Sequence, residues 1–262
     1  MDDTILHDDR GETVDVFEEI LTKFENIGAM CSGGVDSSFT LYWLAHCIDV
    51  TGRHSTHSIL PMTLLEPLSE LAYCNIKEVQ QIIQLVKDNF PKVSILDHYV
   101  YECKDNHPTD GDEKKFTNKK HRDMLLNAGM VDHIVGSVCA APVFEDIDFG
   151  WIISTQRDIS NQTNKLEVVG DIYRLQSPFG FVDKKFAAYN YKKYDLMDSI
   201  FPLTKSCVDP DVNGSPCRNC SWCLEKYWAY GMYDDCIDSP EPNWAAAKNW
   251  HKQGTEPHIY HD

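Results

Sequence analysis

Two groups of residues in this sequence have types and spacing that suit chemistry, and the first is a glycine–serine loop near the N-terminus. The run Cys31-Ser-Gly-Gly-Val-Asp-Ser-Ser38 follows a short apolar stretch at 27–30 and precedes an amphipathic stretch at 39–46. This order predicts a strand, a glycine turn and a helix start. Adjacent glycines let the backbone come close to a ligand because no Cβ obstructs it, and a helix N-terminus favours an anion. The loop therefore predicts a phosphate-binding site.

The composition of this loop separates it from two common phosphate-binding motifs. It does not end in Gly-Lys-Ser/Thr, as a Walker A loop does, and it lacks the third glycine of a dinucleotide fingerprint. The seven residues from Ser32 to Ser38 resemble the PP-loop of ATP pyrophosphatases, which split ATP into AMP and pyrophosphate. The resemblance implies that the phosphates are held by Ser32, Gly33, Gly34, Ser37 and Ser38. Asp36 adds a carboxylate beside them, and Mg²⁺ prefers oxygen ligands of this kind.

The second group is a set of four cysteines near the C-terminus, Cys207, Cys217, Cys220 and Cys223. Two-residue gaps let neighbouring thiolates turn onto one metal, and a nearby fourth thiolate completes a tetrahedron. All-sulfur tetrahedral coordination suits Zn²⁺, and an iron–sulfur cluster is the alternative. A zinc ion with four protein ligands has no open position, so it would be structural and would fasten the C-terminal segment to the domain. The remaining cysteines look isolated, and we expect most of them to be small core residues.

Helical and strand-like stretches alternate along the chain and must position these two groups. Apolar residues at helical spacing predict helices at 13–25, 38–47, 75–87 and 114–127. Apolar runs predict strands at 27–30, 57–62, 93–101, 131–137 and 172–176. The polar, acidic residues 1–12 are expected to form a loose lead-in. This alternation implies an α/β fold, a doubly wound parallel five-stranded sheet like that of adenine nucleotide alpha hydrolases, with a small zinc-binding segment after it.

Ligands of such sheets lie beyond the carboxyl ends of the strands. Met62 ends the second predicted strand and resembles an adenine-contacting position of PP-loop proteins, although a core methionine is the alternative. Gly136 follows the fourth strand, where it would approach the nucleotide or substrate or would serve as an ordinary turn glycine. Residues 139–171 suggest an insertion over the site, for which a lid is one interpretation. We expect a nucleotide-binding domain at 1–200, a zinc-binding segment at 201–233 and an extension at 234–262.

The charge and hydropathy of the chain disfavour several classes of function. A formal net charge of −17 and a pI near 4.9 repel nucleic acid phosphates, so a tRNA or DNA partner is not expected. No run of about 18 apolar residues predicts a membrane span, and the first residues do not resemble a signal peptide. We therefore expect a cytoplasmic protein whose ten cysteines are thiols or metal ligands. Its oligomeric state is left open, a homodimer included.

Taken together, the loop and the cysteine segment resemble the QueC family of 7-cyano-7-deazaguanine (preQ0) synthases. Besides the loop, the likeness lies in Ser177-Pro178-Phe179 with Lys184, in Ser206-Cys207, and in the run from Cys217 to Ala229. The resemblance implies that ATP adenylates the carboxylate of 7-carboxy-7-deazaguanine and that ammonia displaces AMP to give an amide. A second ATP would then drive dehydration of the amide to the nitrile.

The same resemblance implies that Asp36, Ser37 and Lys184 are the catalytic residues. Lys184 would neutralise the charge that builds on the pyrophosphate. Its neighbours Asp183 and Lys185 are both charged, which leaves an exposed, non-catalytic lysine as the alternative.

Two stretches depart from the family pattern. After Gly136 the family carries an acidic segment of the Tyr-Pro-Asp-Cys type, whereas this chain has Ser137-Val-Cys-Ala-Ala-Pro-Val-Phe-Glu-Asp-Ile-Asp148. Arg218 also stands where glycine is usual. Three alternatives therefore stay open. The protein could transfer a deazaguanine to an amine or use another carboxylate, it could be a tRNA-modifying ligase or thiolase, or it could be a non-catalytic nucleotide-binding module.

Overall fold

The computed structural model describes most of the chain, with gaps. The described residues are 3–65, 75–102, 123–124, 126–129, 131–136, 139, 168–169, 173–207, 210–211, 213–218, 220–236 and 242. Most of the expected helix at 114–127, of the insertion at 139–171 and of the extension at 234–262 lies outside them.

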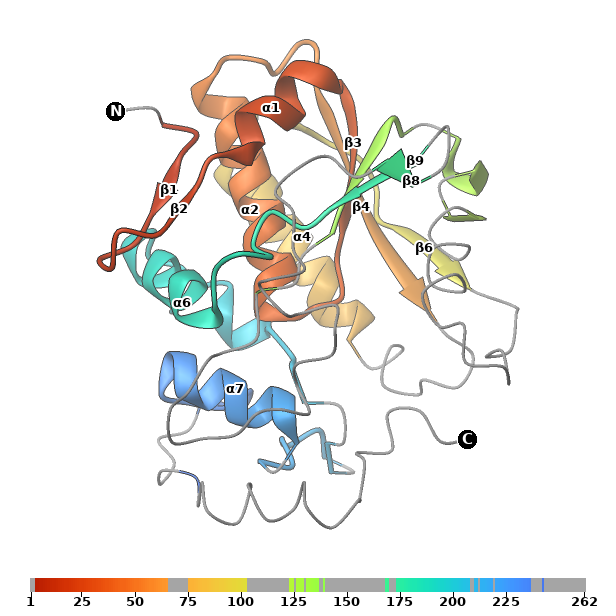
Figure 1. Ribbon diagram of the computed structural model, residues 1–262. Coiled ribbons are helices and arrows are strands. Elements are labelled where there is room, and N and C mark those ends of the chain that lie inside the picture. The colour runs from red at the N-terminus through yellow and green to blue at the C-terminus, as the bar shows by residue number, and fades with distance from the viewer. Residues whose placement is uncertain are drawn as a thin grey trace.

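The centre of the molecule is a sheet in which the strand order is β5-β4-β3-β7-β9-β8, with β6 also paired to β4 (Figure 1). Its strands are β3 (Asn26–Met30), β4 (Ser58–Leu65), β5 (Ser94–Ile95), β6 (Tyr99–Glu102), β7 (His133–Val135), β8 (Val168–Val169) and β9 (Tyr173–Gln176). Every pairing in it is parallel except that of β8 with β9. Strand β5 pairs with the first residues of β4, and β6 pairs with its last residues. Because these two short strands follow one another along β4, they count as one, and the parallel part of the sheet is five strands wide, as the sequence predicts.

Strand β4 is longer than predicted, because it continues past Pro61 to Leu65. A proline has no N–H to donate to a neighbouring strand. The partner on one side is interrupted at this level: β5 pairs with Ser58 and Ile59, and β6 pairs again from Met62 onward. Pro61 therefore interrupts the neighbouring strand, predicted at 93–101, which forms the two short strands β5 and β6. It does not interrupt β4, the strand in which it lies.

Helices cover both faces of the sheet. Figure 1 shows helices α1 (Val16–Lys23), α2 (Val35–Val50) and α4 (Ile76–Asn89) lying together along one side of β3. Buried residues of these helices form a large core with Ile27, Ala29 and Val135. Leu60, Met62 and Ile134 form a second core with Met124, from the described part of the expected helix at 114–127. Because a helix packs on each face, the sheet is doubly wound.

After the sheet, the chain forms the helices that carry the C-terminal half of the site. Helix α6 (Lys184–Lys193) begins behind Asp183, and a single 3₁₀ turn, η2 (Phe201–Leu203), leads to the cysteine segment. Helix α7 (Ser221–Tyr230) starts at Cys220 and ends at Gly231, whose φ of 76° is the left-handed conformation common at helix ends. Helices α6 and α7 are adjacent (Figure 1), which places the cysteine segment against the main domain.

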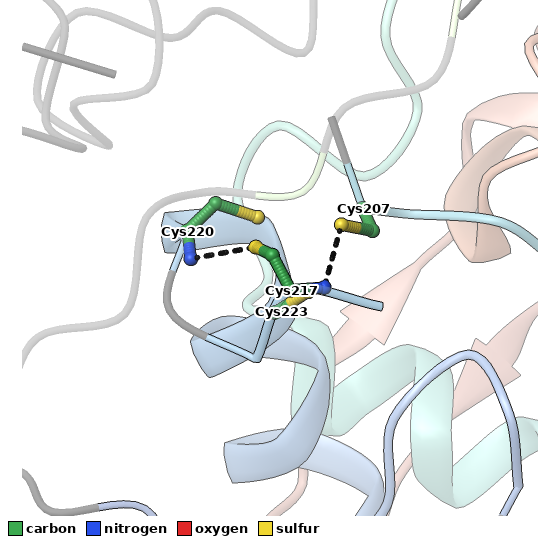
Figure 2. A group of neighbouring side chains, drawn as sticks. All are labelled: Cys207, Cys217, Cys220 and Cys223. Carbon is green, nitrogen blue, oxygen red and sulfur yellow. Dashed lines mark hydrogen bonds between the residues drawn. The ribbon is translucent and has the colours of Figure 1, made fainter. Parts of the chain in front are cut away.

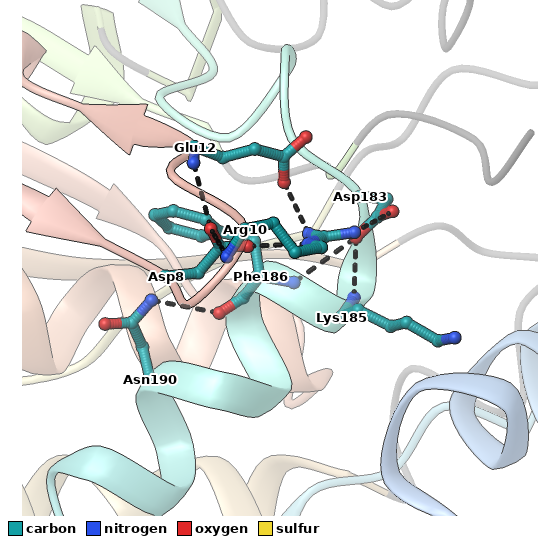
Figure 3. A network of polar contacts seen from close by, with 7 residues as sticks. All are labelled: Asp8, Arg10, Glu12, Asp183, Lys185, Phe186 and Asn190. Carbon is teal, nitrogen blue, oxygen red and sulfur yellow. Dashed lines mark hydrogen bonds and ion pairs between the residues drawn. The ribbon is translucent and has the colours of Figure 1, made fainter.

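The expectation of a loose lead-in at residues 1–12 is wrong. Strands β1 (Leu6–His7) and β2 (Thr13–Val14) pair antiparallel, and Leu6 is buried in the main core. Arg10, in the turn between them, donates through its two terminal nitrogens to both carboxylate oxygens of Asp183, at 2.8 and 2.9 Å (Figure 3). Asp183 also accepts hydrogen bonds from the backbone N–H groups of Lys185 and Phe186, so it caps α6. The hairpin is therefore fastened to the helix that begins with Lys184.

The hairpin contact predicts that Arg10→Ala will lower the free energy of unfolding by about 1 kcal/mol, because a two-pronged ion pair and its hydrogen bonds to Asp8 and Glu12 are lost. Arg10→Lys should recover only part of this, since an ammonium cannot reproduce the planar fork. Urea unfolding measures both values. Identical unfolding of Arg10→Ala and the wild type would contradict the contact.

Close packing at Gly28 gives a second prediction. A Cβ at this position would lie 2.6 Å from Met62 Sδ and 3.1 Å from Val131 Cγ1. We expect Gly28→Ala to lower the free energy of unfolding by about 1–3 kcal/mol, because the buried Met62 must leave its rotamer. Thermal unfolding monitored by circular dichroism is the measurement, and an unchanged melting temperature would show that the two strands are less closely packed than described.

Candidate functional site

The glycine–serine loop joins β3 to α2, as predicted. Gly33 has a φ of +81°, which a residue with a side chain rarely adopts, and a Cβ there would lie 3.1 Å from Val79 of α4. Gly34 occupies the N-cap position of α2 in an extended conformation. The two glycines thus allow a sharp turn directly under the helix start.

Hydroxyl groups of the loop hold its shape. The Ser32 and Ser37 hydroxyls lie 3.1 Å apart, and both the Ser37 and the Ser38 hydroxyls donate to the Gly34 carbonyl, at 3.1 and 2.8 Å. The first helical hydrogen bond of α2 runs from the Ser38 N–H to the Gly34 carbonyl. The N–H groups of residues 35–37 precede that bond, and such groups with the helix dipole form a ready site for an anion. The loop is therefore pre-shaped for a phosphate.

Lys184 is buried beside this loop, which contradicts the alternative that it is an exposed lysine. Only 2% of the residue is exposed. Its Nζ lies 3.5 Å from the Asp36 carboxylate and donates to Glu225 Oε2 at 3.1 Å. The ammonium group also lies 5.7 Å from the centre of the Trp222 ring. Residues from the first turns of α2 and α6 and from the middle of α7 thus meet at one charged group.

This meeting point is costly to bury, and charge pairing offsets that cost. Side-chain exposure is 3% for Lys184, 12% for Asp36 and 0% for Glu225. An isolated charge in such a place would be strongly unfavourable, whereas a buried pair roughly balances its desolvation. One cation is thus shared by two carboxylates at the N-terminal end of α2.

Two buried groups next to the loop are unsuited to act as nucleophiles. Burial raises the pKa of the Cys31 thiol to about 12, so the thiolate is scarce near neutral pH. The Tyr191 hydroxyl donates to the Val35 carbonyl at 2.9 Å, and burial raises the pKa of this phenol well above its usual value. Both groups therefore support the loop.

The two residues predicted to contact the nucleotide lie near the loop, but Met62 lies within β4 and not at its end, where the sequence predicts it. The Met62 side chain is fully buried in the second core, and its carbonyl accepts a hydrogen bond from the Cys31 N–H at 2.7 Å. Gly136 directly follows β7, whose Val135 pairs with Ala29 of β3, so it lies level with the end of β3. Contact of either residue with a nucleotide stays a prediction.

Sequence reasoning missed Glu225 as a site residue. Glu225 and Lys226 are adjacent opposite charges in an otherwise apolar and aromatic stretch, Trp222 to Trp228, and both are buried. Charges in such a stretch are tolerated when each is paired, and this signal could have marked both residues. Lys205 was also missed, although its backbone N–H donates to the Gly33 carbonyl at 2.8 Å.

The four predicted cysteines do come together. Their sulfur atoms all lie within 4.8 Å of one another. Figure 2 shows Cys217, Cys220 and Cys223 at the start of α7, facing Cys207 on the incoming chain. The backbone N–H groups of Cys217 and Cys220 donate to the sulfurs of Cys207 and Cys217, at 3.2 and 3.3 Å. Four thiols with N–H donors directed at two of the sulfurs form a donor set that suits one metal ion.

A buried ion pair fastens the cysteine segment. Lys226 Nζ donates to Asp234 at 2.6 Å and to the Thr204 carbonyl at 3.1 Å. The other Asp234 oxygen accepts from the backbone N–H groups of Ser206 and Cys207, both at 2.7 Å. Cys207 is thus positioned by the same pair that anchors α7.

Comparisons with known proteins find no matching family model and no matching curated protein. The similar solved structures include the following three. The U34-tRNA thiolase NcsA from Methanococcus maripaludis, with its [4Fe-4S] cluster, is 13% identical, with a TM-score of 0.41 over 66% of this chain and 58% of that one. NMN synthetase from Francisella tularensis is 14% identical, with a TM-score of 0.41 over 92% and 90%. NAD+ synthetase from Burkholderia pseudomallei is 12% identical, with a TM-score of 0.38 over 90% and 84%. At these identities, function must be argued from the residues of this chain.

Among the described residues, no helix combines the length and the apolar character needed to cross a membrane.

The cysteine cluster predicts one tightly bound metal ion per chain. We expect Cys220→Ser to lose that ion and to melt at a lower temperature, because one of four ligands is gone. Cys236→Ser is the matched control, since Cys236 is exposed and stands apart from the cluster. Elemental analysis of the purified proteins gives the metal content. Equal metal loss in both variants, or a wild type that carries no metal, would be inconsistent with this cluster.

Proposed function

We propose that this protein is an ATP-dependent carbon–nitrogen ligase that cleaves ATP between the α- and β-phosphates. In this reaction a carboxylate substrate is adenylated, and ammonia then displaces AMP. The observation that carries the proposal is the buried Lys184, paired with Asp36 at the start of α2, directly behind the Gly33–Gly34 turn.

The charges of this site match the needs of phosphate chemistry. Catalysis of phosphoryl and nucleotidyl transfer depends chiefly on positioning and on charge stabilisation. The loop hydroxyls and the α2 N-terminus would hold the phosphates, and Lys184 would stabilise the negative charge that grows on the leaving pyrophosphate. A buried ion pair adds little net stability to a fold, so a role in binding and catalysis accounts better for its place beside the loop.

Asp36 would hold Mg²⁺ or support the loop, and the ion would offset negative charge on the phosphates of ATP. The carboxylate substrate would attack the α-phosphorus, which forms a P–O bond to the substrate and breaks the bond to pyrophosphate. Ammonia would then attack the activated carbonyl, AMP would leave with the bonding electrons, and the nitrogen would lose a proton.

We further propose 7-carboxy-7-deazaguanine as the carboxylate, with a second ATP converting the amide into the nitrile preQ0. The sequence resemblance at the loop and at the cysteine segment supports this choice. Zn²⁺ is the proposed metal of the cluster, because bonds of about 2.3 Å place tetrahedral sulfurs about 3.8 Å apart. The observed spread of up to 4.8 Å is compatible with a single ion at the centre.

A second candidate uses the same ATP chemistry with another acceptor, another carboxylate or an amine that receives a deazaguanine. It is favoured by the stretch after Gly136, which does not carry the Tyr-Pro-Asp-Cys type of segment that the family has there.

The test is a mass-spectrometric assay with ATP, Mg²⁺, ammonium and 7-carboxy-7-deazaguanine. We expect AMP, pyrophosphate and preQ0 from the wild type, and at least a hundredfold lower rate from Asp36→Asn, because charge stabilisation at the phosphates is lost. Asp49→Asn is the matched control, since Asp49 lies on the same helix but at its far end, paired with His54.

Each outcome of this assay has a distinct meaning. ADP in place of AMP would contradict cleavage between the α- and β-phosphates. AMP without preQ0 would support cleavage of ATP to AMP but would contradict 7-carboxy-7-deazaguanine as the substrate, and it would favour another acceptor. Nucleotide binding without any turnover, over a panel of carboxylates, would favour a binding module.

A further inference from the structure

We propose that Glu225 is a positioning residue of the nucleotide site, which keeps Lys184 in place when Lys184 turns from Asp36 to the phosphates of ATP. The cysteine segment would then contribute one residue, Glu225, to the function of the nucleotide site. This inference rests on the proposed function, because it requires the loop to bind ATP.

The geometry at Lys184 is asymmetric. Glu225 is the closer carboxylate, at 3.1 Å against 3.5 Å for Asp36, and its side chain is fully buried. Asp36 lies in the first turn of α2, next to the predicted phosphate site, and retains some exposure. A bound triphosphate with Mg²⁺ would therefore compete for Asp36 and for the ammonium group, while Glu225 stays out of reach behind them.

Helix α7 presents two contacts to the ammonium group from one face. Trp222 and Glu225 are three residues apart, which places them on the same side of a helix. The Trp222 ring lies 5.7 Å from Lys184 Nζ and limits the directions in which the amine can turn. A lysine that leaves Asp36 would thus pivot about Glu225 toward the loop.

The position of α7 is itself fixed by the cysteine segment. Its N-cap is Cys220, and Lys226, the residue after Glu225, is anchored to Thr204 and Asp234. The chain that follows Thr204 reaches the loop directly, through the Lys205 N–H on the Gly33 carbonyl. The segment therefore reaches the site at two points, the Gly33 carbonyl of the loop and Lys184 of α6.

A purely structural ion pair and a positioning residue predict different results for double variants. If Glu225 acts on the nucleotide only through Lys184, removing Glu225 has no further effect once Lys184 is gone. If the two residues contribute separately, the losses add.

The experiment measures the affinity for Mg²⁺ and α,β-methylene ATP by calorimetry, for the wild type, Glu225→Gln, Lys184→Met and the double variant. We expect Glu225→Gln to bind about tenfold more weakly, and Lys184→Met and the double variant to be equal to each other and weaker still. Glu19→Gln, an exposed residue of α1, is the control and should bind as the wild type does. Metal content and melting temperature are recorded for each protein.

The outcomes separate this inference from the proposed function. Additive losses, or a Glu225→Gln variant that binds normally, would overturn the positioning role while ATP binding stands. A wild type that does not bind the nucleotide would overturn the proposed function and this inference with it.

If Glu225→Gln loses its metal, the variant Glu225→Asp decides, since it keeps the negative charge but moves it away from Lys184. Weaker binding by a metal-loaded Glu225→Asp supports the role, and normal binding refutes it.

Discussion

The arrangement of this protein depends on keeping one lysine ammonium group charged inside it. Lys184 is nearly inaccessible to water, so its charge requires the carboxylates of Asp36 and Glu225 within 3.5 Å. These residues belong to three helices that are far apart in sequence. The sheet order places α2 beside α4, α6 packs on α2, and α7 packs on α6. If any of these contacts moved by a few ångströms, a buried charge would lose its partner. The glycine–serine loop lies beside this buried cluster, because Asp36 is part of it, at the start of α2.

The cysteine segment has little apolar core of its own. Its buried cluster consists mainly of the four cysteines and Tyr233, with Trp222 and Tyr227 packed at its edge. The Lys226–Asp234 pair supplies part of the order that a larger core would give, and a metal bound by the cysteines would supply more. The consequence reaches the site, because the same helix that begins at the cluster carries Glu225. A change in metal content would thus affect the proposed ATP site without any contact between the metal and the nucleotide.

Local spacing predicted much of this structure. The loop, the alternation of strands and helices and the four-cysteine cluster are encoded by neighbouring residues, and all three are found. Contacts between distant segments were not predictable in this way. Glu225 meets a lysine 41 positions earlier, and Arg10 meets Asp183 across 173 positions. The burial of Lys184 was equally hidden, since its charged neighbours suggested an exposed turn. The end of β4 was predicted too early, near Pro61. The hydrogen bond that this proline cannot donate is lost to the adjacent strand, which is interrupted there, while β4 itself continues.

The most direct measurement is a crystal structure of the protein with Mg²⁺ and α,β-methylene ATP. Our account predicts phosphates on the N–H groups and hydroxyls between Ser32 and Ser38, with Asp36 turned toward Mg²⁺. Lys184 Nζ would lie within hydrogen-bonding distance of a phosphate oxygen and would keep its contact with Glu225. A nucleotide bound away from the loop would contradict the account, as would a lysine that stays on Asp36 with phosphates in place.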